Sequence, residues 1–284
     1  MNTAEAFTLA CALDVAVRKP GNVSRASPGH RMRADDFVAS AAAAAAPITT
    51  PGAGVGERIE AAVEATWAAV GCNTNLGIVL LAAPLARAAE APGATASLAA
   101  LGDTLAGVLG ALDVADAAAA FRAITRAQPA GLGQAPEQDV RAAPDVDLRA
   151  AMALAAGRDR IAAQYTNGFA DVLALAAQAQ NEGFPGGDRA ATTAVVQRLH
   201  LECLARWPDS HIVRKHGEAV AQTVLHAAQR WRGHPAPDSD AGFAAWDEQL
   251  KREGLNPGTS ADLTVAALFA AALVGDVPCK WHGT

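Results

Sequence analysis

The chain has 284 residues and a formal net charge of −6, with 51% hydrophobic and 18% charged residues. These proportions supply a sizeable core, and the scattered Lys and Arg lack the basic face that is typical of nucleic-acid binders. Only 5% of the residues are aromatic, and alanine fills most apolar positions. Because alanine favours helices, whereas strands favour β-branched and aromatic residues, we expect an all-α fold. One compact multi-helix bundle should cover residues 1–284.

Turns that contain glycine or proline divide the first half into helices. Lys19-Pro20-Gly21 ends the first helix, and Gly71 ends the third. The run Gly77-Ile78-Val79-Leu80-Leu81 would also suit a buried strand, but no neighbouring run offers a pairing partner. The expected helices are 3–17, 35–46, 57–70, 76–89, 95–112 and 114–125, the last two forming a hairpin across Asp113.

A Pro-, Gly- and Gln-rich stretch at residues 126–146 separates the two halves and is the best candidate for an exposed loop. The regions on either side of it do not differ in composition, so it does not mark a domain boundary. The expected helices of the second half are 147–165, 168–180, 188–206, 208–216, 218–232, 241–253 and 260–274.

The cysteines and the apolar runs indicate the cellular compartment. Cys11, Cys72, Cys203 and Cys279 are far apart and show neither metal-ligand spacing nor a disulfide framework. The N-terminal stretch lacks the basic flank of a signal peptide. The longest apolar run, Leu263 to Val274, is shorter than the ~20 residues that span a bilayer. We therefore expect a cytoplasmic protein with no membrane partner.

Four polar clusters occur near expected helix ends or starts, next to glycine or proline. Helix starts offer unpaired N–H groups and a dipole that favours anions, so such clusters are candidate phosphate sites. Each also has a simpler interpretation as a helix cap, a helix exit or a charged surface turn. The clusters are Arg18 to Arg25, Gly71 to Gly77, Trp207 to Gly217 and Asn256 to Leu263.

Taken in order, these clusters resemble the triphosphoribosyl-dephospho-CoA synthase family. Leu13-Asp14-Val15 with Lys19-Pro20-Gly21-Asn22-Val23 looks like its opening signature. Asn73-Thr74-Asn75-Leu76-Gly77 is similar to its Asn-Thr-His-Lys-Gly motif. Pro208 to Gly217 and Asn256 to Leu263 are similar to its two later elements, so the resemblance spans nearly the whole chain.

The resemblance implies an ATP-dependent transferase. It would move the triphosphoribosyl group of ATP to 3′-dephospho-CoA or a related phosphorylated acceptor, with loss of adenine and with Mg²⁺ bound to ATP. Developing charge at the ribose needs a carboxylate, and the triphosphate needs cations or helix starts. The implied catalytic residues are Asp14, Asp209 and Asp262, of which Asp209 and Asp262 would also bind the metal. The implied substrate-binding residues are Lys19, Gly21, Asn22, Ser24, Arg25, Asn73, Thr74, Asn75, Arg214, Lys215, Asn256, Gly258 and Ser260.

Several positions depart from the family pattern. Asn75-Leu76 stands where the family has His-Lys, and Ser24 stands where it has Asp. These departures leave two alternatives open. One is an enzyme of tetrahydromethanopterin or methylofuran biosynthesis that acts on a different phosphorylated substrate. The other is a non-catalytic helical nucleotide-binding protein. In each case the partners are phosphorylated small molecules rather than nucleic acid, and a homodimer stays open.

Overall fold

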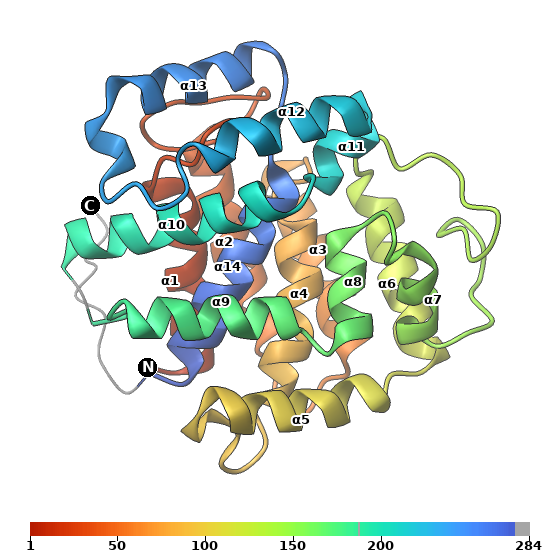
Figure 1. Ribbon diagram of the computed structural model, residues 1–284. Coiled ribbons are helices and arrows are strands. Elements are labelled where there is room, and N and C mark those ends of the chain that lie inside the picture. The colour runs from red at the N-terminus through yellow and green to blue at the C-terminus, as the bar shows by residue number, and fades with distance from the viewer. Residues whose placement is uncertain (187, 276–284) are drawn as a thin grey trace.

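The computed structural model describes residues 1–186 and 188–275, and Cys279 lies outside them. Over these residues the chain forms fourteen α-helices, two short 3-10 helices and no strand, which confirms the all-α prediction (Figure 1). The helices of the first half are α1 (Thr3–Ala16), α2 (Ala34–Ile48), α3 (Val55–Val70), α4 (Leu76–Ala88), η1 (Ala94–Ala96), α5 (Leu98–Gly110) and α6 (Val114–Ala127).

The second half departs from prediction in one place. The helix expected over 147–165 is two helices, because Asp159 starts a new one by accepting hydrogen bonds from the N–H groups of Ile161 and Ala162. The helices are α7 (Leu148–Ala155), α8 (Arg160–Asn167), α9 (Ala170–Asn181), α10 (Arg189–Arg206), α11 (Ser210–His216), α12 (Glu218–Gln229), η2 (Pro237–Ser239), α13 (Ala241–Arg252) and α14 (Gly258–Leu273).

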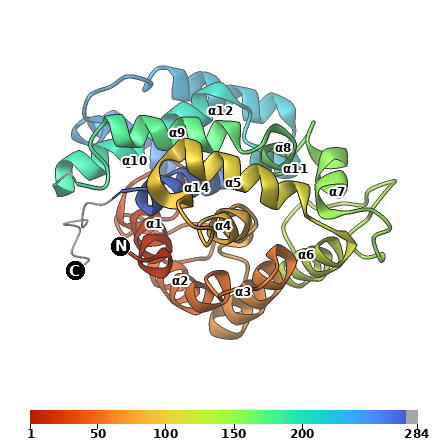
Figure 2. The ribbon, with the colours of Figure 1, turned by 90° about the horizontal axis from the view of Figure 1, so that it is seen from below.

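Helices α4 and α14 form the centre of the molecule. Figure 2 shows α4 end-on, surrounded by other helices. Every residue of α4 except Arg87 is buried, and so is every residue of α14 except Gly258 and Asp262. Neither helix therefore needs a polar face, and alanine along α14 lets neighbouring backbones approach closely. The two accessible residues of α14 lie in its first two turns.

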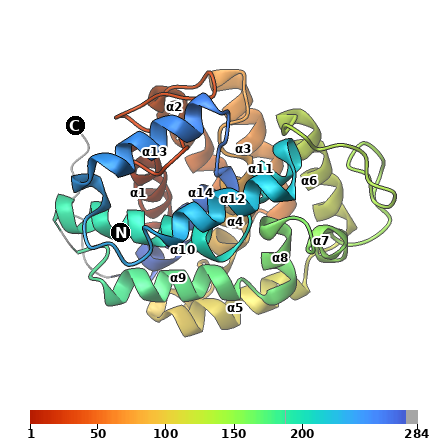
Figure 3. The same ribbon diagram turned by 45° about the horizontal axis from the view of Figure 1, so that its top comes forward.

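A second, smaller core lies under α10, α11, α12 and α13, which lie towards the viewer in Figure 3. Aromatic rings make up part of it, and Trp231 stacks on Trp246 with a centroid separation of 6.4 Å and an interplanar angle of 11°. This layer packs over the start of α14, so it helps to hold that helix start in place.

Helices α5 and α6 meet at 95°, so they do not form the antiparallel hairpin expected across Asp113. Within the described residues no single helix has the length and hydropathy needed to cross a membrane. This bent pair meets the criterion together, by length and composition only.

Candidate active site

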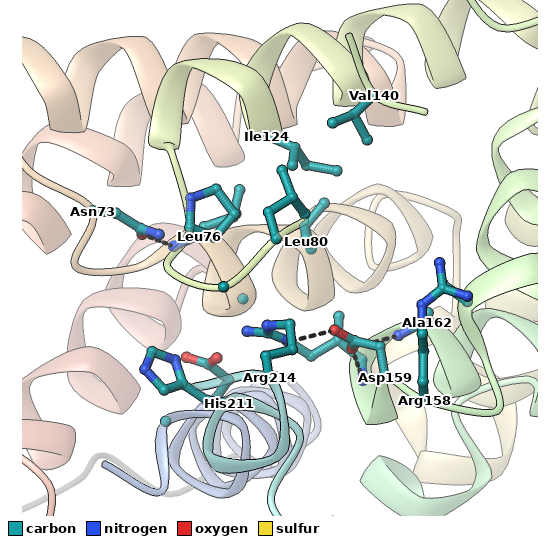
Figure 4. Close-up of a pocket in the computed structure, with 18 of the residues that line it drawn as sticks. Asn73, Leu76, Leu80, Ile124, Val140, Arg158, Asp159, Ala162, His211 and Arg214 are labelled. Carbon is teal, nitrogen blue, oxygen red and sulfur yellow. Dashed lines mark hydrogen bonds and ion pairs between the residues drawn. The ribbon is translucent and has the colours of Figure 1, made fainter. Parts of the chain in front are cut away.

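A cavity of about 480 Å³ lies where the starts of α4, α8 and α14 meet α11 (Figure 4). Eight of the residues proposed from the sequence line it, although they come from the four separate clusters and from a position before the first of them. They are Asp14, Asn22, Asn73, Thr74, Arg214, Asn256, Gly258 and Asp262.

Asp262 reaches the cavity from the second turn of α14. Its carboxylate lies against Gly77, so any side chain at that position would overlap it; a Cβ there would also lie 2.7 Å from Ile161 Cδ1. Burial raises the pKa of Asp262 well above its usual range, and the neighbouring carboxylates of Asp14 and Asp209 raise it further. Glycine in the Asn-Thr-Asn-Leu-Gly cluster thus makes room for a catalytic candidate that lies 185 residues later in the chain.

Asp14 lines the same cavity from α1 and is held by Lys19. The Lys19 ammonium lies 3.0 Å from Asp14 Oδ1 and also donates a hydrogen bond to the main-chain oxygen of Asp14. Both side chains are buried, and Lys19 does not line the cavity. Lys19 therefore compensates the charge of Asp14, and we now assign it this role in place of the expected substrate contact.

Gly21 and Asn22 connect the first cluster to the last. Gly21 has φ +79° and packs against the main-chain oxygen of Leu255, where a Cβ would lie at 2.7 Å. Its N–H donates to Asp247 Oδ1 at 2.8 Å, so Gly21 acts in packing and does not line the cavity. Asn22 Nδ2 donates to Asn256 Oδ1 at 3.0 Å, and the buried Oδ1 of Asn22 has no hydrogen-bond donor in the described structure. That oxygen is available to a ligand.

The side chains of the second cluster, Gly71 to Gly77, point in two directions, some into the cavity and one away from it. Asn73 Oδ1 accepts a hydrogen bond from the N–H of Leu76 at 3.2 Å, so Asn73 caps α4 and also lines the cavity. Thr74 lines the cavity too, and its Oγ1 donates to Ser40 Oγ at 2.6 Å. Asn75 faces away, donating to Thr66 Oγ1 at 3.0 Å. Leu76, the residue after it, lines the cavity.

Asp209 does not line the cavity, and its carboxylate is fully used by the protein. One oxygen accepts from the N–H groups of His211 and Ile212, at 3.0 and 3.2 Å. The other accepts from Ser260 N and Oγ, at 2.7 and 2.8 Å. No lone pair remains for a metal, so the geometry argues against the catalytic and metal-binding roles expected for Asp209 and the substrate contact expected for Ser260.

The hydrogen bonds of Asp209 form part of a larger connection that we call the helix-start link: Asp209, Ser210, Ser260 and the N–H of Arg160. Ser210 Oγ accepts from Arg160 N at 2.9 Å. The link thereby joins the starts of α8, α11 and α14. Each of these helices supplies side chains to the cavity, so the link fixes their relative positions.

Arg214 and His211 enter the cavity from α11. Arg214 pairs with Asp159 at 2.7 Å, and its Nε is buried without a hydrogen-bond acceptor (Figure 4). Burial lowers the pKa of His211 to about 3, and the cations Arg214 and Lys215 lower it further. His211 is therefore neutral at physiological pH. A single histidine in a charged turn carries no signal of its own, whereas Asp159 could have been identified by its position as a cap before α8.

Three further expected contacts also lie outside the cavity. Ser24 is buried, and its Oγ has no hydrogen-bond partner in the described ranges. Arg25 is exposed and is fixed only through its N–H, which donates to Val15 at 2.7 Å. Lys215 is exposed on α11. None of the three contacts a ligand placed in this cavity without a change in structure.

The loop between α6 and α7 forms one wall of the cavity. It is exposed over most of its length, as expected, and several of its residues also line the cavity, including Leu132 and Val140. Gly131 packs against Arg214, where a Cβ would lie 2.8 Å from the main-chain oxygen. Across residues 1–186 and 188–275 no group of three or more His, Cys, Asp and Glu side chains could hold a metal by itself.

Comparison with known proteins agrees with this arrangement. The family model for ATP:dephospho-CoA triphosphoribosyl transferase matches residues 1–278. A crystal structure of a candidate triphosphoribosyl-dephospho-CoA synthase from Archaeoglobus fulgidus is similar in fold, with a TM-score of 0.67 and 22% identity. The match covers 84% of this chain and 99% of that one. No curated protein matches the sequence.

Proposed function

The chain belongs to the ATP:dephospho-CoA triphosphoribosyl transferase family, and we propose that its cavity transfers the triphosphoribosyl group of ATP to an acceptor hydroxyl. In this reaction the N-glycosidic bond of ATP breaks, the acceptor oxygen bonds to the anomeric carbon, and adenine leaves with a proton. The observation that carries the proposal is the pairing of Asp14 and Asp262 in one cavity beside two helix starts.

The carboxylates suit the bond that breaks. Cleavage of an N-glycosidic bond builds positive charge at the anomeric carbon, and a negative group placed beforehand next to it lowers the barrier. Asp14 is compensated by Lys19, whereas Asp262 has no ion-pair partner within the described residues. The raised pKa of Asp262 reflects the lack of a cation beside it, so a positive charge that develops there would favour the ionised carboxylate and be stabilised by it.

The helix starts and the arginine side chains of the cavity suit a triphosphate. The first turns of α4 and α14 line the cavity at Leu76, Gly77 and Gly258, and the positive end of a helix dipole favours anions. The N–H groups of Leu76 and Gly258 already bond to Asn73 and Asn256, so these two positions offer the helix dipole rather than a direct N–H contact. Arg158 and Arg214 add positive charge. Neutral His211 can donate or accept a hydrogen bond without adding charge, which suits the adenine base or the ribose.

The donor set also fits Mg²⁺. This ion binds proteins through one or two carboxylates and keeps the remaining positions for water and substrate phosphates. Asp14 and Asp262 would hold it, in place of the Asp209 and Asp262 pair expected from the sequence. The bound ion would supply charge neutralisation for the triphosphate. Three protein ligands are unnecessary in such a site, so the lack of a larger cluster in the described structure is compatible with it.

The function can be tested without knowing the acceptor, because water can replace it. We expect the protein with ATP and Mg²⁺ to release adenine slowly, measured by chromatography. Asp262→Asn should lower that rate about a hundredfold or more, by the scale of lost electrostatic stabilisation. Asp240→Asn, at the exposed cap of α13, is the matched control and should keep the rate. Failure to release adenine, together with no calorimetric binding of Mg²⁺–ATP, would contradict the proposal.

A further inference from the structure

Two asparagine side chains contact each other in the wall of the cavity. Asn22 lies in the turns that follow α1, Asn256 lies just before α14, and both residues line the cavity. Asn22 Nδ2 donates to Asn256 Oδ1 at 3.0 Å. This bond uses the donor group of one amide and the acceptor of the other. We call the two residues the asparagine pair.

The asparagine pair leaves one polar atom of each residue unused. Asn22 Oδ1 is buried and has no hydrogen-bond donor within residues 1–186 and 188–275. Asn256 Nδ2 donates to no acceptor in the same ranges. A buried oxygen without a donor costs free energy, so such an atom in a cavity wall needs a ligand to satisfy it. The pair is therefore completed by a ligand group that both donates and accepts.

The chemistry of the pair restricts which part of Mg²⁺–ATP it can bind. Phosphate oxygens only accept hydrogen bonds, so they would leave Asn22 Oδ1 without a donor. Mg²⁺ takes oxygen ligands and would be repelled by the amide N–H groups of Asn256. A ribose hydroxyl both donates and accepts. The amino edge of adenine also has a donor and an acceptor, on separate atoms.

The position of the pair favours the ribose over the amino edge of adenine. The N–H of Asn22 donates to the main-chain oxygen of Lys19 at 2.9 Å, and the Lys19 ammonium lies 3.0 Å from Asp14. Asn256 is followed by α14, whose second turn carries Asp262. The pair is thus connected to both carboxylates that the proposed function puts beside the anomeric carbon. The 2′-hydroxyl is on the next carbon of the ribose, whereas the amino group of adenine points away from the glycosidic bond.

We propose that the asparagine pair binds the 2′-hydroxyl of the ATP ribose and makes the site specific for ribonucleotides. The hydroxyl donates to Asn22 Oδ1 and accepts from Asn256 Nδ2. This inference rests on the proposed function, because it concerns the ribose whose bond to adenine breaks in the cavity. A 2′-deoxy nucleotide lacks the donor and leaves the oxygen of Asn22 unsatisfied.

The test compares ATP with 2′-deoxy-ATP in the adenine-release assay, as the ratio of their kcat/KM values. Asn22→Ala removes the oxygen, so the preference for ATP should fall about ten- to a hundredfold relative to the wild type. The easier cleavage of a 2′-deoxy glycosidic bond cancels, because it is the same for both proteins. A lower folded fraction of the variant cancels too, because it scales both rates equally. If the variant turns over too slowly, the same ratio is taken from calorimetric affinities of the Mg²⁺ complexes.

A matched variant and a matched substrate give the controls. Asn73 lines the same cavity, but its oxygen already accepts from the N–H of Leu76. Asn73→Ala should therefore keep the wild-type preference for ATP over 2′-deoxy-ATP, even if its turnover falls. The preference for ATP over 3′-deoxy-ATP should be the same in the wild type and in Asn22→Ala.

Two results would overturn the inference. One is an equal preference for ATP over 2′-deoxy-ATP in the wild type and in Asn22→Ala. The other is a loss in Asn22→Ala that is the same for both nucleotides and is restored by more Mg²⁺, which would make Asn22 a metal ligand. Both results leave the proposed function standing, because that function is judged by adenine release from ATP by the wild type.

Discussion

The two ends of the cavity are built by different means. The polar end consists of helix starts joined by hydrogen bonds of defined length, among them the two from Ser260 to Asp209. The other end consists of the α6–α7 loop and of apolar side chains such as Leu132, which lines the cavity and keeps part of its surface exposed. Reacting groups must be placed accurately, whereas an apolar contact tolerates variation in shape. We therefore expect substitutions at the polar end to change turnover more than substitutions at the other end.

The strongest test of the polar end is Gly77→Ala. The added methyl group overlaps the Asp262 carboxylate, so Asp262 must move, and adenine release should fall about 10²–10³-fold. Gly107→Ala is the matched control, since it is also a helical glycine but has open space around it. We expect this control to keep its activity and to gain up to about 1 kcal/mol of stability. Equal activity of both variants in the adenine assay would show that the position of Asp262 is unimportant.

The helix-start link is tested by Asp209→Ser. Serine still caps α11, but it is too short to reach Ser260, so α11 and α14 lose their direct connection. We expect adenine release to fall about tenfold and stability to fall by about 1–3 kcal/mol. Asp240→Ser changes a cap that bonds only within its own turn, and adenine release should be unaffected. A loss of stability in Asp209→Ser with full turnover would show that the link has no part in placing the site.

The neutrality of His211 predicts a dependence of stability on pH. Its pKa is about 3 in the folded protein and near 6.5 when exposed, so between these values the unfolded chain binds more protons. The contribution of neutral His211 to the free energy of unfolding is therefore complete above pH 6.5. It is lost as the pH falls towards 3, at up to about 1.4 kcal/mol per pH unit. His211→Gln should flatten this part of the denaturation profile. His226→Gln, at an exposed position of α12, should leave the profile as it is in the wild type.

Local patterns predicted the helices well and the site only in part. Helix content follows from alanine and from caps, which are properties of neighbouring residues. Asp14, Asn73 and Asp262 were identified by resemblance, but the contact between Gly77 and Asp262 depends on packing between distant helices. Such packing also decides the role of Asp209, because an aspartate that caps a helix and an aspartate that binds a metal can stand in the same local sequence. His211 was missed for a similar reason, since a single histidine carries no signal until its surroundings are known.

The long sequence separations within the polar end have a consequence for how the protein acquires activity during synthesis. Asn22 bonds to Asn256 across 234 positions, and Gly21 bonds to Asp247 across 226. Chains fold progressively from the N-terminus as they leave the ribosome, so the early helices must wait for α13 and α14 before these bonds can form. A nascent chain that stops before α14 lacks Asp262 and leaves the apolar face of α4 uncovered. Synthesis of α14, closure of the core and assembly of the site thus become a single late event.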